Sequence, residues 1–287
     1  MVEWNNDDYA GMLLLDRMNE STESTDALHA FALDELLCRQ AGEGGPPICH
    51  LWRHPRAFIL GQRDARLPQA AAAIGRLTAA SVQTAVRSSG GAAVPLDMGV
   101  VNVSLILPIG RTDEAGLRFN HDFERMYALV RQALASVNVN EQVDKGEIAG
   151  AYCPGDYDLS IGGLKFCGIA QRRQAKALIV HAFVVAEGSG RARAAAVRAF
   201  YDEAAGNIAP SGKTYPHVEP GSTASLEELT SIGTQASATF AEGVKRAIRA
   251  CQRPEAIAQS AAKLRLPDAD QLAGMIAALR SRYHFTP

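Results

Sequence analysis

The sequence predicts a mixed α/β (α+β) protein, with a sheet formed first along the chain and helices last. Short apolar segments separated by Gly and Pro turns dominate up to about residue 186, which is typical of strands. Apolar residues at helical spacing recur after that point. With 287 residues, 47% of them hydrophobic, the chain is long enough for one large domain, or one domain with a small appendage. This order of elements predicts an α/β or α+β core with a helical end.

The first part of the chain predicts one helix and four strands. Apolar residues at helical spacing predict a helix over residues 25–41, capped by Ser24 or Thr25. The strands are predicted over residues 48–53, 57–62, 82–87 and 100–108. His54-Pro55 divides the first two, and the third runs into Ser88-Ser89-Gly90-Gly91.

The later part predicts more strands and then a run of helices. Residues 158–161 and 165–171 form a predicted hairpin closed by Gly162-Gly163. Residues 177–186 form a predicted buried strand. Helices are predicted over residues 120–137, 192–205, 225–230, 235–252 and 267–282, with breaks near Pro254 and Pro267. We therefore predict a catalytic domain over residues 1–221 and a helical extension packed on it over residues 222–287.

Charge and hydropathy exclude several classes of function. The formal net charge is only -2, so no long-range field would gather nucleic acid. The first eight residues are acidic, whereas a secretory signal begins with basic residues. The longest strongly apolar run, residues 177–186, is half of the roughly 20 residues that a membrane helix needs. We expect a cytoplasmic protein that binds neither nucleic acid nor membrane.

Five cysteines occur, an odd number with no CxxC pair, which argues against a disulfide framework and a structural zinc site. In a reducing cytoplasm they are free thiols. Most free cysteines are small buried hydrophobic residues, so each needs its own reason to be called reactive. They are Cys38, Cys49, Cys153, Cys167 and Cys251.

A segment that resembles a phosphate loop, residues 206–214, fails the test of spacing. Five residues separate Gly206 from Gly212-Lys213, whereas a phosphate loop has four. The preceding segment is predicted to be a helix rather than a strand, and Pro210 lies inside the loop. We interpret it as a surface loop.

Cys153, directly before Pro154-Gly155, is predicted to lie on a turn, where a thiol is exposed. Lys165 lies twelve positions later on the far arm of the hairpin and can return to the same cleft. A nearby ammonium lowers the pKa of a thiol and stabilises the oxyanion formed when a thioester is attacked. Cys167 is the second candidate nucleophile, because residues two apart on a strand share a face. His181, in an apolar strand, is interpreted as a core histidine.

Adjacent glycines at Gly90 and Gly91 let the backbone approach a ligand closely. Their N–H groups can point at a carbonyl or carboxylate oxygen. From these residues alone, a plain turn is the simpler interpretation.

Two motifs resemble the lipoate–protein ligase and octanoyltransferase superfamily. The first is Arg87-x-x-Gly90-Gly91-x-Ala93-Val94-x-x-Asp97-x-Gly99, followed by Asn102 and Ser104. The second is Asp158-Leu159-Ser160, followed by Gly163-x-Lys165-x-x-Gly168-x-Ala170-Gln171-Arg172-Arg173. The resemblance covers residues 25 to 230 and implies the biotin/lipoyl-ligase-like fold, a mixed, mostly antiparallel sheet packed with helices.

Other segments resemble one branch of the superfamily, the octanoyl-[glycine cleavage H protein]:protein octanoyltransferases. They are Tyr152-Cys153-Pro154-Gly155-Asp156, His217-Val218-Glu219-Pro220 and Ala224-Ser225-Leu226. The ligases usually carry a third glycine where this chain has Ala92, lack the cysteine and need ATP. Cys153 together with the loss of that glycine therefore favours transfer over ligation.

The resemblance implies octanoyl transfer from glycine cleavage H protein to lipoyl domains of 2-oxo acid dehydrogenase complexes. It implies no cofactor and no metal. Cys153 would form the acyl-enzyme and Lys165 would contact the acyl carbonyl. Substrate-binding residues would be Arg87, Gly90, Gly91, Asp158 and Gly168. An acyl carrier protein donor, an ATP-dependent ligase and a non-catalytic lipoyl-domain binder remain alternatives.

Overall fold

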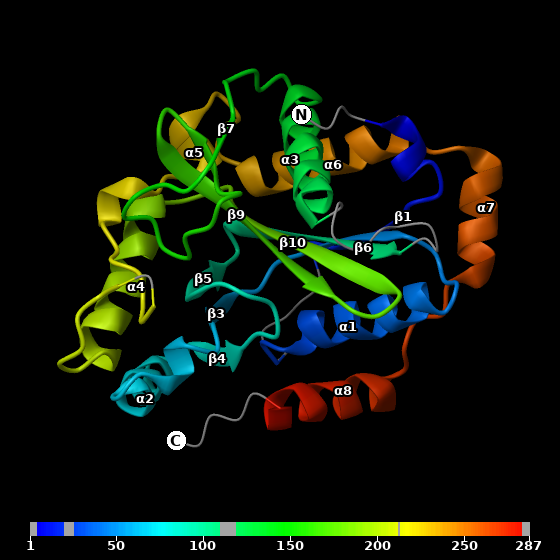
Figure 1. Cartoon of the computed structure of the whole chain (residues 1–287). Helices are drawn as coiled ribbons and strands as arrows, with labels where there is room; N and C mark the ends of the chain where they lie inside the picture. Colours follow the sequence, from blue (N-terminus) through cyan, green and yellow to red (C-terminus); the bar gives the residue numbers. More distant parts are fainter. Residues whose placement is uncertain (1–4, 20–25, 110–118, 212, 283–287) are drawn as a thin grey trace.

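The computed structural model describes residues 5–19, 26–109, 119–211 and 213–282 and contains two sheets (Figure 1). The larger sheet has the strand order β1 (Leu13–Arg17), β2 (Ile48–Trp52), β6 (Val100–Pro108), β10 (Ala177–Val185), β9 (Leu164–Arg173), β8 (Leu159–Ile161) and β7 (Asp144–Lys145). The smaller sheet has the order β4 (Gln83–Val86), β3 (Arg56–Leu60) and β5 (Val94–Asp97). Among the strands of the described ranges, only the β1–β2 and β3–β4 pairs are parallel. The predicted mixed, mostly antiparallel sheet is confirmed.

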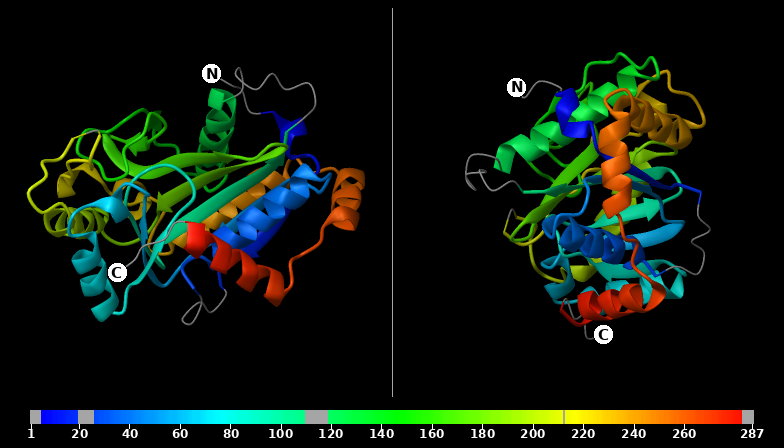
Figure 2. Two further views of the ribbon diagram at one scale, coloured as in Figure 1. Left: turned by 60° about the horizontal axis from the view of Figure 1, so that its bottom comes forward. Right: turned by 90° about the vertical axis from the view of Figure 1, so that its right-hand side faces the viewer.

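Helices cover both faces of the larger sheet (Figures 1 and 2). One face packs against α3 (Phe119–Ala135) and α6 (Ala236–Arg249), and the other against α1 (His29–Gly42). The other helices are α2 (Ala70–Ala79), α4 (Gly190–Ala204), α5 (Leu226–Leu229), α7 (Pro254–Lys263) and α8 (Ala269–Arg282). Three short 3₁₀ segments are η1 (Asn6–Tyr9), η2 (Asp64–Arg66) and η3 (Pro220–Ser222).

The centre of the larger sheet is the antiparallel pair β6 and β10. Both strands are rich in Val, Ile and Leu, which suits strands that are covered on both faces. Val103 and Leu105 pack toward α3 and α6, whereas Ile106 packs toward α1. The ends of both strands predicted from the apolar runs agree with the structure to within one residue. Two-sided burial therefore explains why these strands were the easiest to predict.

Other boundaries differ from the prediction. Helix α1 begins at His29, because Asp26 accepts hydrogen bonds from Leu28 N (2.9 Å, side chain) and His29 N (2.8 Å, backbone) and so forms a turn before the helix. The predicted caps Ser24 and Thr25 lie outside the described residues. Pro254 begins α7 rather than only breaking a helix, since the first helical turn needs no N–H from that residue. The sequence patterns did not predict β1, α2, β5 and β7, which are short or Ala-rich.

The helical C-terminal region packs against the sheet domain. Phe240, Val244 and Ile248 of α6 lie in the same hydrophobic core as β6, β10 and α3. Met275 and Leu279 of α8 are buried in the core around the smaller sheet, and α8 packs on α1. The predicted division at residues 221 and 222 stays a prediction.

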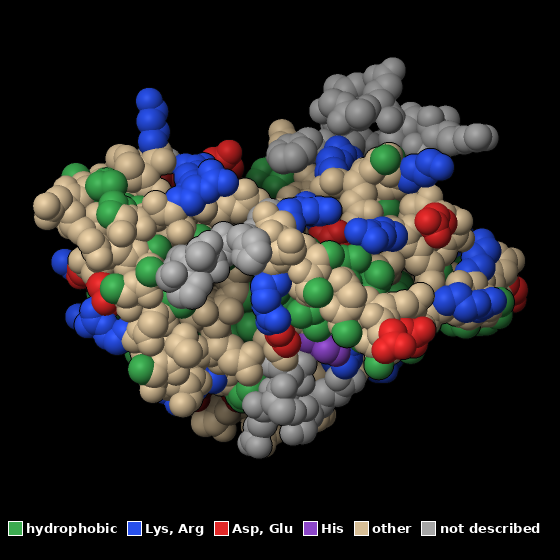
Figure 3. All heavy atoms as spheres, turned by 90° about the horizontal axis from the view of Figure 1, so that it is seen from below, with side chains coloured by type: hydrophobic (Ala, Val, Ile, Leu, Met, Phe, Trp, Pro, Cys, Tyr) green, Lys and Arg blue, Asp and Glu red, His purple; other side chains and the backbone are tan. Residues whose placement is uncertain are grey.

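The surface seen from below in Figure 3 carries basic and acidic side chains interspersed with hydrophobic ones. No helix within the described ranges has the length and apolar character needed to cross a bilayer.

Candidate functional site

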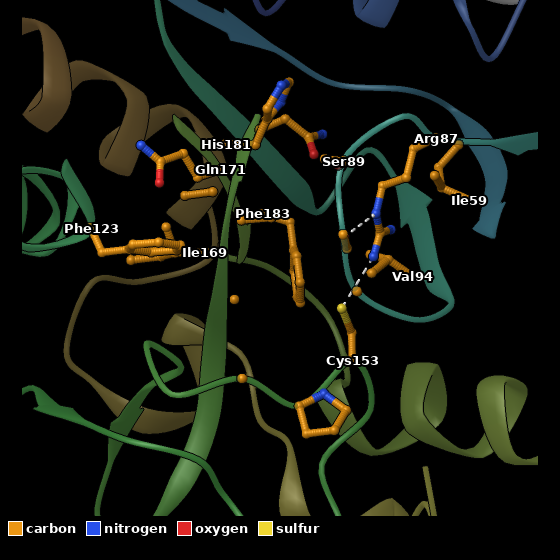
Figure 4. Close-up of a pocket in the computed structure, with 18 of the residues that line it drawn as sticks. Ile59, Arg87, Ser89, Val94, Phe123, Cys153, Ile169, Gln171, His181 and Phe183 are labelled. Carbon is orange, nitrogen blue, oxygen red and sulfur yellow. Dashed lines mark hydrogen bonds between the residues drawn. The ribbon is translucent and has the colours of Figure 1, made fainter. Parts of the chain in front are cut away.

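A cavity of about 310 Å³ lies where the two sheets and α1 meet. Its volume is at the lower end of the range typical of small-molecule sites. In Figure 4, Cys153 lies at one end and His181 at the other, with the ring of Phe183 between them. The apolar walls come from six elements, α1, β3, β5, α3, β9 and β10. Their main residues are Phe31, Ile59, Val94, Leu96, Phe123, Ile169, Ala182 and Phe183.

Cys153 lies in the wall of this cavity, half-buried, on the loop before β8. Its sulfur accepts hydrogen bonds from Arg87 Nη2 at 3.2 Å and from Ala92 N at 3.3 Å. The residue has φ of 48°, a left-handed conformation that costs a non-glycine residue free energy and is enriched at functional sites. A cation and a backbone N–H directed at one sulfur stabilise its thiolate form.

Arg87 ties the Gly90-Gly91 loop to this cysteine. Its Nε donates to Gly90 O at 3.0 Å, and Nη2 donates to Ala92 O at 2.6 Å as well as to the sulfur. Gly91 has φ of 101°, and a Cβ there would lie 2.5 Å from Arg87 Nη2 and 2.8 Å from Cys153 Sγ. The loop is therefore more than a plain turn, because only glycine at this position allows the contact between arginine and sulfur.

Lys165 is fully buried behind the cysteine loop. Its Nζ donates to Tyr152 O at 2.8 Å, to Cys153 O at 2.7 Å and to Asp158 Oδ2 at 2.7 Å. An ammonium has three donors, so all of them are used. The sequence argument placed Lys165 beside the thiol, whereas its ammonium contacts the carbonyl of Cys153. Lys165 thus holds the loop that presents the sulfur.

Asp158 completes this buried pair. Its Oδ2 also accepts from Gly155 N at 3.2 Å, so the carboxylate bridges the loop to Lys165. Burial raises the pKa of Asp158 to about 6, and the positive charge of Lys165 partly opposes that rise. Asp158 does not line the cavity and acts on the loop from behind.

Cys167 faces away from the cavity, which contradicts the expectation that it shares a face with Lys165. Ser160 pairs with Lys165 and Leu159 with Cys167, so one extra residue, Phe166, interrupts the register as a β-bulge. The bulge breaks the two-residue alternation, and Cys167 lies in the core against α3 and α6. Burial raises the pKa of its thiol, which makes it a poor nucleophile.

Gly168 forms part of the cavity wall. A Cβ there would lie 2.5 Å from Phe183 Cε1, so glycine leaves room for that ring. Phe183 in turn stacks on Tyr152, with ring centroids 5.7 Å apart. Gly168 therefore sets the position of an aromatic wall. Phe183 carried no motif of its own in the sequence.

His181 lines the far end of the cavity. Its Nδ1 lies 3.4 Å from Ser104 Oγ and 3.8 Å from Asp34 Oδ2. Burial lowers its pKa, which favours the neutral imidazole. Asp34 also contacts His50, with its Oδ1 at 2.8 Å from His50 Nδ1. The interpretation of His181 as a core histidine did not predict its place in the cavity wall. That place depends on the pairing of β10 with β6 and β9, which the sequence does not reveal.

The segment that resembles a phosphate loop follows α4, a helix, as predicted. Its described residues form a self-contained loop in which Ser211 Oγ and Thr214 Oγ1 are 2.9 Å apart. Gly212 lies outside the described residues.

Comparison with known proteins assigns the family. Residues 26–242 match the lipoyl protein ligase A/B catalytic domain. The chain belongs to this family. A relative from Exiguobacterium sibiricum, named octanoyl-[GcvH]:protein N-octanoyltransferase, is 41% identical over 220 residues, 74% of this chain and 76% of its own. A relative of the same name from Geobacillus kaustophilus is 43% identical over 71% of this chain and 70% of its own. A Listeria monocytogenes relative, 38% identical over 71% and 72%, is named lipoyl-[GcvH]:protein N-lipoyltransferase.

Two lipoate ligase structures share the fold. The bi-partite lipoate protein ligase of Thermoplasma acidophilum has a TM-score of 0.61 at 18% identity, covering 96% of this chain and 93% of its own. A lipoate-protein ligase A bound with ATP has a TM-score of 0.59 at 18% identity, covering 96% and 95%. The predicted superfamily and fold are confirmed, and the protein is an acyltransferase of this family.

Proposed function

We propose that the protein transfers an octanoyl group from octanoylated glycine cleavage H protein to a lysine of lipoyl domains, through a thioester on Cys153. The observation that carries this proposal is the position of the Cys153 sulfur, in the cavity wall between Arg87 Nη2 and Ala92 N. The names and similarity of the relatives support the donor and the acyl group.

In the first half of the reaction, the Cys153 thiolate attacks the carbonyl carbon of the octanoyl-lysine amide. A carbon–sulfur bond forms, the carbon–nitrogen bond breaks, and the leaving lysine amine takes a proton from solvent. Arg87 and the Ala92 N–H stabilise the thiolate before attack and lie beside the carbonyl that acquires negative charge. Lys165 and Asp158 hold the loop in this position rather than touching the substrate.

In the second half, the neutral ε-amine of the acceptor lysine attacks the thioester and releases the Cys153 thiolate. The amine must lose its proton first, because the ammonium has no lone pair. One amide replaces another, so the overall reaction is close to thermoneutral and needs no ATP.

The cavity fits an extended acyl chain. The path from Cys153 toward His181 runs past Phe183 between apolar walls (Figure 4). Burying the chain contributes about 0.8 kcal/mol per methylene. A lipoyl group is the second acyl group to test, because the Listeria relative is named for it.

Intact mass spectrometry tests the proposal. The enzyme is incubated without nucleotide with octanoylated H protein or, separately, with octanoyl-acyl carrier protein. We expect one octanoyl group on the enzyme from H protein, none on Cys153→Ala, and wild-type loading on the matched control Cys167→Ala. Loading of Cys153→Ala, or an absolute requirement for ATP, contradicts the mechanism. If the enzyme is loaded only by octanoyl-acyl carrier protein, the donor is acyl carrier protein and not H protein.

A further inference from the structure

A buried hydroxyl–carboxylate pair lies behind the loop that faces Cys153. Tyr201 Oη accepts a hydrogen bond from Ala93 N at 3.1 Å and donates one to Asp64 Oδ1 at 2.8 Å. Asp64 Oδ2 accepts from Gly61 N at 2.7 Å. Tyr201 belongs to α4 and Asp64 to η2, so the pair connects two elements that lie 137 positions apart in sequence.

These hydrogen bonds have a fixed direction. A backbone N–H can only donate and an ionised carboxylate can only accept, so the Tyr201 hydroxyl accepts from Ala93 and donates to Asp64. Asp64 is 2% and Tyr201 is 1% exposed, so water does not replace either partner. The Ala93 amide is therefore held in one orientation.

A second contact holds the other side of the same loop. A Cβ built on Gly61 would lie 2.1 Å from Gly91 O, so the backbone at Gly61 lies directly against that carbonyl. The Ala92 N–H, which donates to Cys153 Sγ at 3.3 Å, belongs to the peptide group of that Gly91 carbonyl. Gly61 on one side and Tyr201 on the other thus bracket the group that faces the sulfur.

We propose that Tyr201 and Asp64 are positioning residues that direct the Ala92 N–H at the Cys153 sulfur. The inference rests on the proposed role of Cys153 as nucleophile. Hydrogen bonds weaken steeply when the donor angle falls, so a loop that is free to rotate loses this one. The thiolate then loses one of its two hydrogen-bond donors and is less stabilised.

The matched variants are Tyr201→Phe and Tyr215→Phe. The two rings stack with centroids 5.0 Å apart, but the Tyr215 hydroxyl donates to Ile208 O at 2.9 Å, within its own loop. Each variant loses one hydroxyl and keeps its ring. Only Tyr201→Phe removes the hydrogen bond from Ala93.

The first readout is the pH dependence of iodoacetamide alkylation at Cys153, located by peptide mass spectrometry. We expect the midpoint to lie higher in Tyr201→Phe and to stay in place in Tyr215→Phe. The second readout is single-turnover loading from octanoylated H protein, which we expect to slow by about tenfold or more with little change in the donor concentration for half-maximal rate.

An unchanged midpoint in folded Tyr201→Phe, or an equal shift in Tyr215→Phe, overturns the inference. Asp64→Asn is the second variant, because an amide cannot accept from both Gly61 and Tyr201; we expect it to shift the midpoint upward too. If neither variant folds, amide hydrogen exchange of the unaltered protein decides. Ala93 should then exchange as slowly as the core strands, and rapid exchange overturns the inference.

The alkylation readout needs no acyl donor, so the two proposals fail separately. A shifted midpoint in a protein that is never loaded with octanoyl supports the positioning role and contradicts the proposed transfer. Normal octanoyl loading with an unshifted midpoint supports the proposed transfer and contradicts the positioning role.

Discussion

At the scale of single residues, Gly91 shows how one backbone position controls the environment of the Cys153 sulfur. We expect Gly91→Ala to lower the rate of Cys153 acylation by about a hundredfold, the usual effect of misplacing a catalytic group by an ångström. Its Cβ would overlap both Arg87 Nη2 and Cys153 Sγ, and its φ of 101° is strained for alanine. Gly90→Ala is the comparison, since a Cβ there meets nothing within 4 Å. Equal losses in single-turnover loading would contradict this prediction.

The buried Lys165–Asp158 pair predicts a pH-dependent loss of stability. We expect Lys165→Met to lower the free energy of unfolding by about 3–5 kcal/mol at pH 8, because an unpaired carboxylate is left buried. Both side chains are at most 2% exposed, so solvent does not screen them.

The deficit should shrink as the pH falls. The pKa of Asp158 is raised by burial to about 6 beside Lys165, and without that cation it rises further. A carboxyl whose pKa is higher in the folded state than in the unfolded state favours folding as it takes up its proton. Urea unfolding at pH 8 and pH 5 measures the difference from wild type, and equal deficits at both values would contradict the prediction.

The β8–β9 hairpin decides, at the scale of the element, which residues reach the site. The bulge at Phe166 directs Cys167 into the core and leaves Gly168 in the cavity wall. The sequence over residues 158–171 predicts the hairpin and its turn, but it does not predict the extra residue in β9. Neither strand length nor composition reports such an irregularity.

Gly168→Ala should change the preferred acyl length. The added Cβ meets the Phe183 ring at 2.5 Å, and that ring lines the cavity, so its displacement changes the space for the acyl chain. We expect octanoyl loading to fall by about tenfold relative to butanoyl loading, since each methylene that is excluded loses about 0.8 kcal/mol. Competition between the two donors measures the ratio. Gly274→Ala, in α8 and with nothing within 4 Å of its Cβ, should leave it unchanged.

The C-terminal helices contribute unequally at the scale of the whole molecule. Helix α6 supplies Phe240 and Val244 to the core of the larger sheet. In the segment before α5, Ala224 N donates a hydrogen bond to Lys165 O at 3.0 Å. Helix α7 packs against β1, whereas α8 packs on α1 and adds Met275 and Leu279 to the core around the smaller sheet.

We therefore expect a chain ending at residue 221 not to fold, and a chain ending at residue 253 to fold with a lowered melting temperature. Circular dichroism and thermal melts measure both. A cooperative transition in the shorter chain would instead show that residues 1–221 fold without the helical extension.

The sequence by itself determined the fold class, most strands and the pair of motifs, because two-sided burial and glycine-rich turns leave local patterns. It also marked Cys153, through the turn at Pro154-Gly155. Tertiary structure alone decided what surrounds the sulfur. Cys153, the loop from Arg87 to Ala92, Tyr201 and Asp64 come from distant segments, and no local pattern records which of them meet. Lys165 turned out to bind the Cys153 carbonyl rather than its sulfur, because a buried ammonium must satisfy three donors wherever acceptors lie.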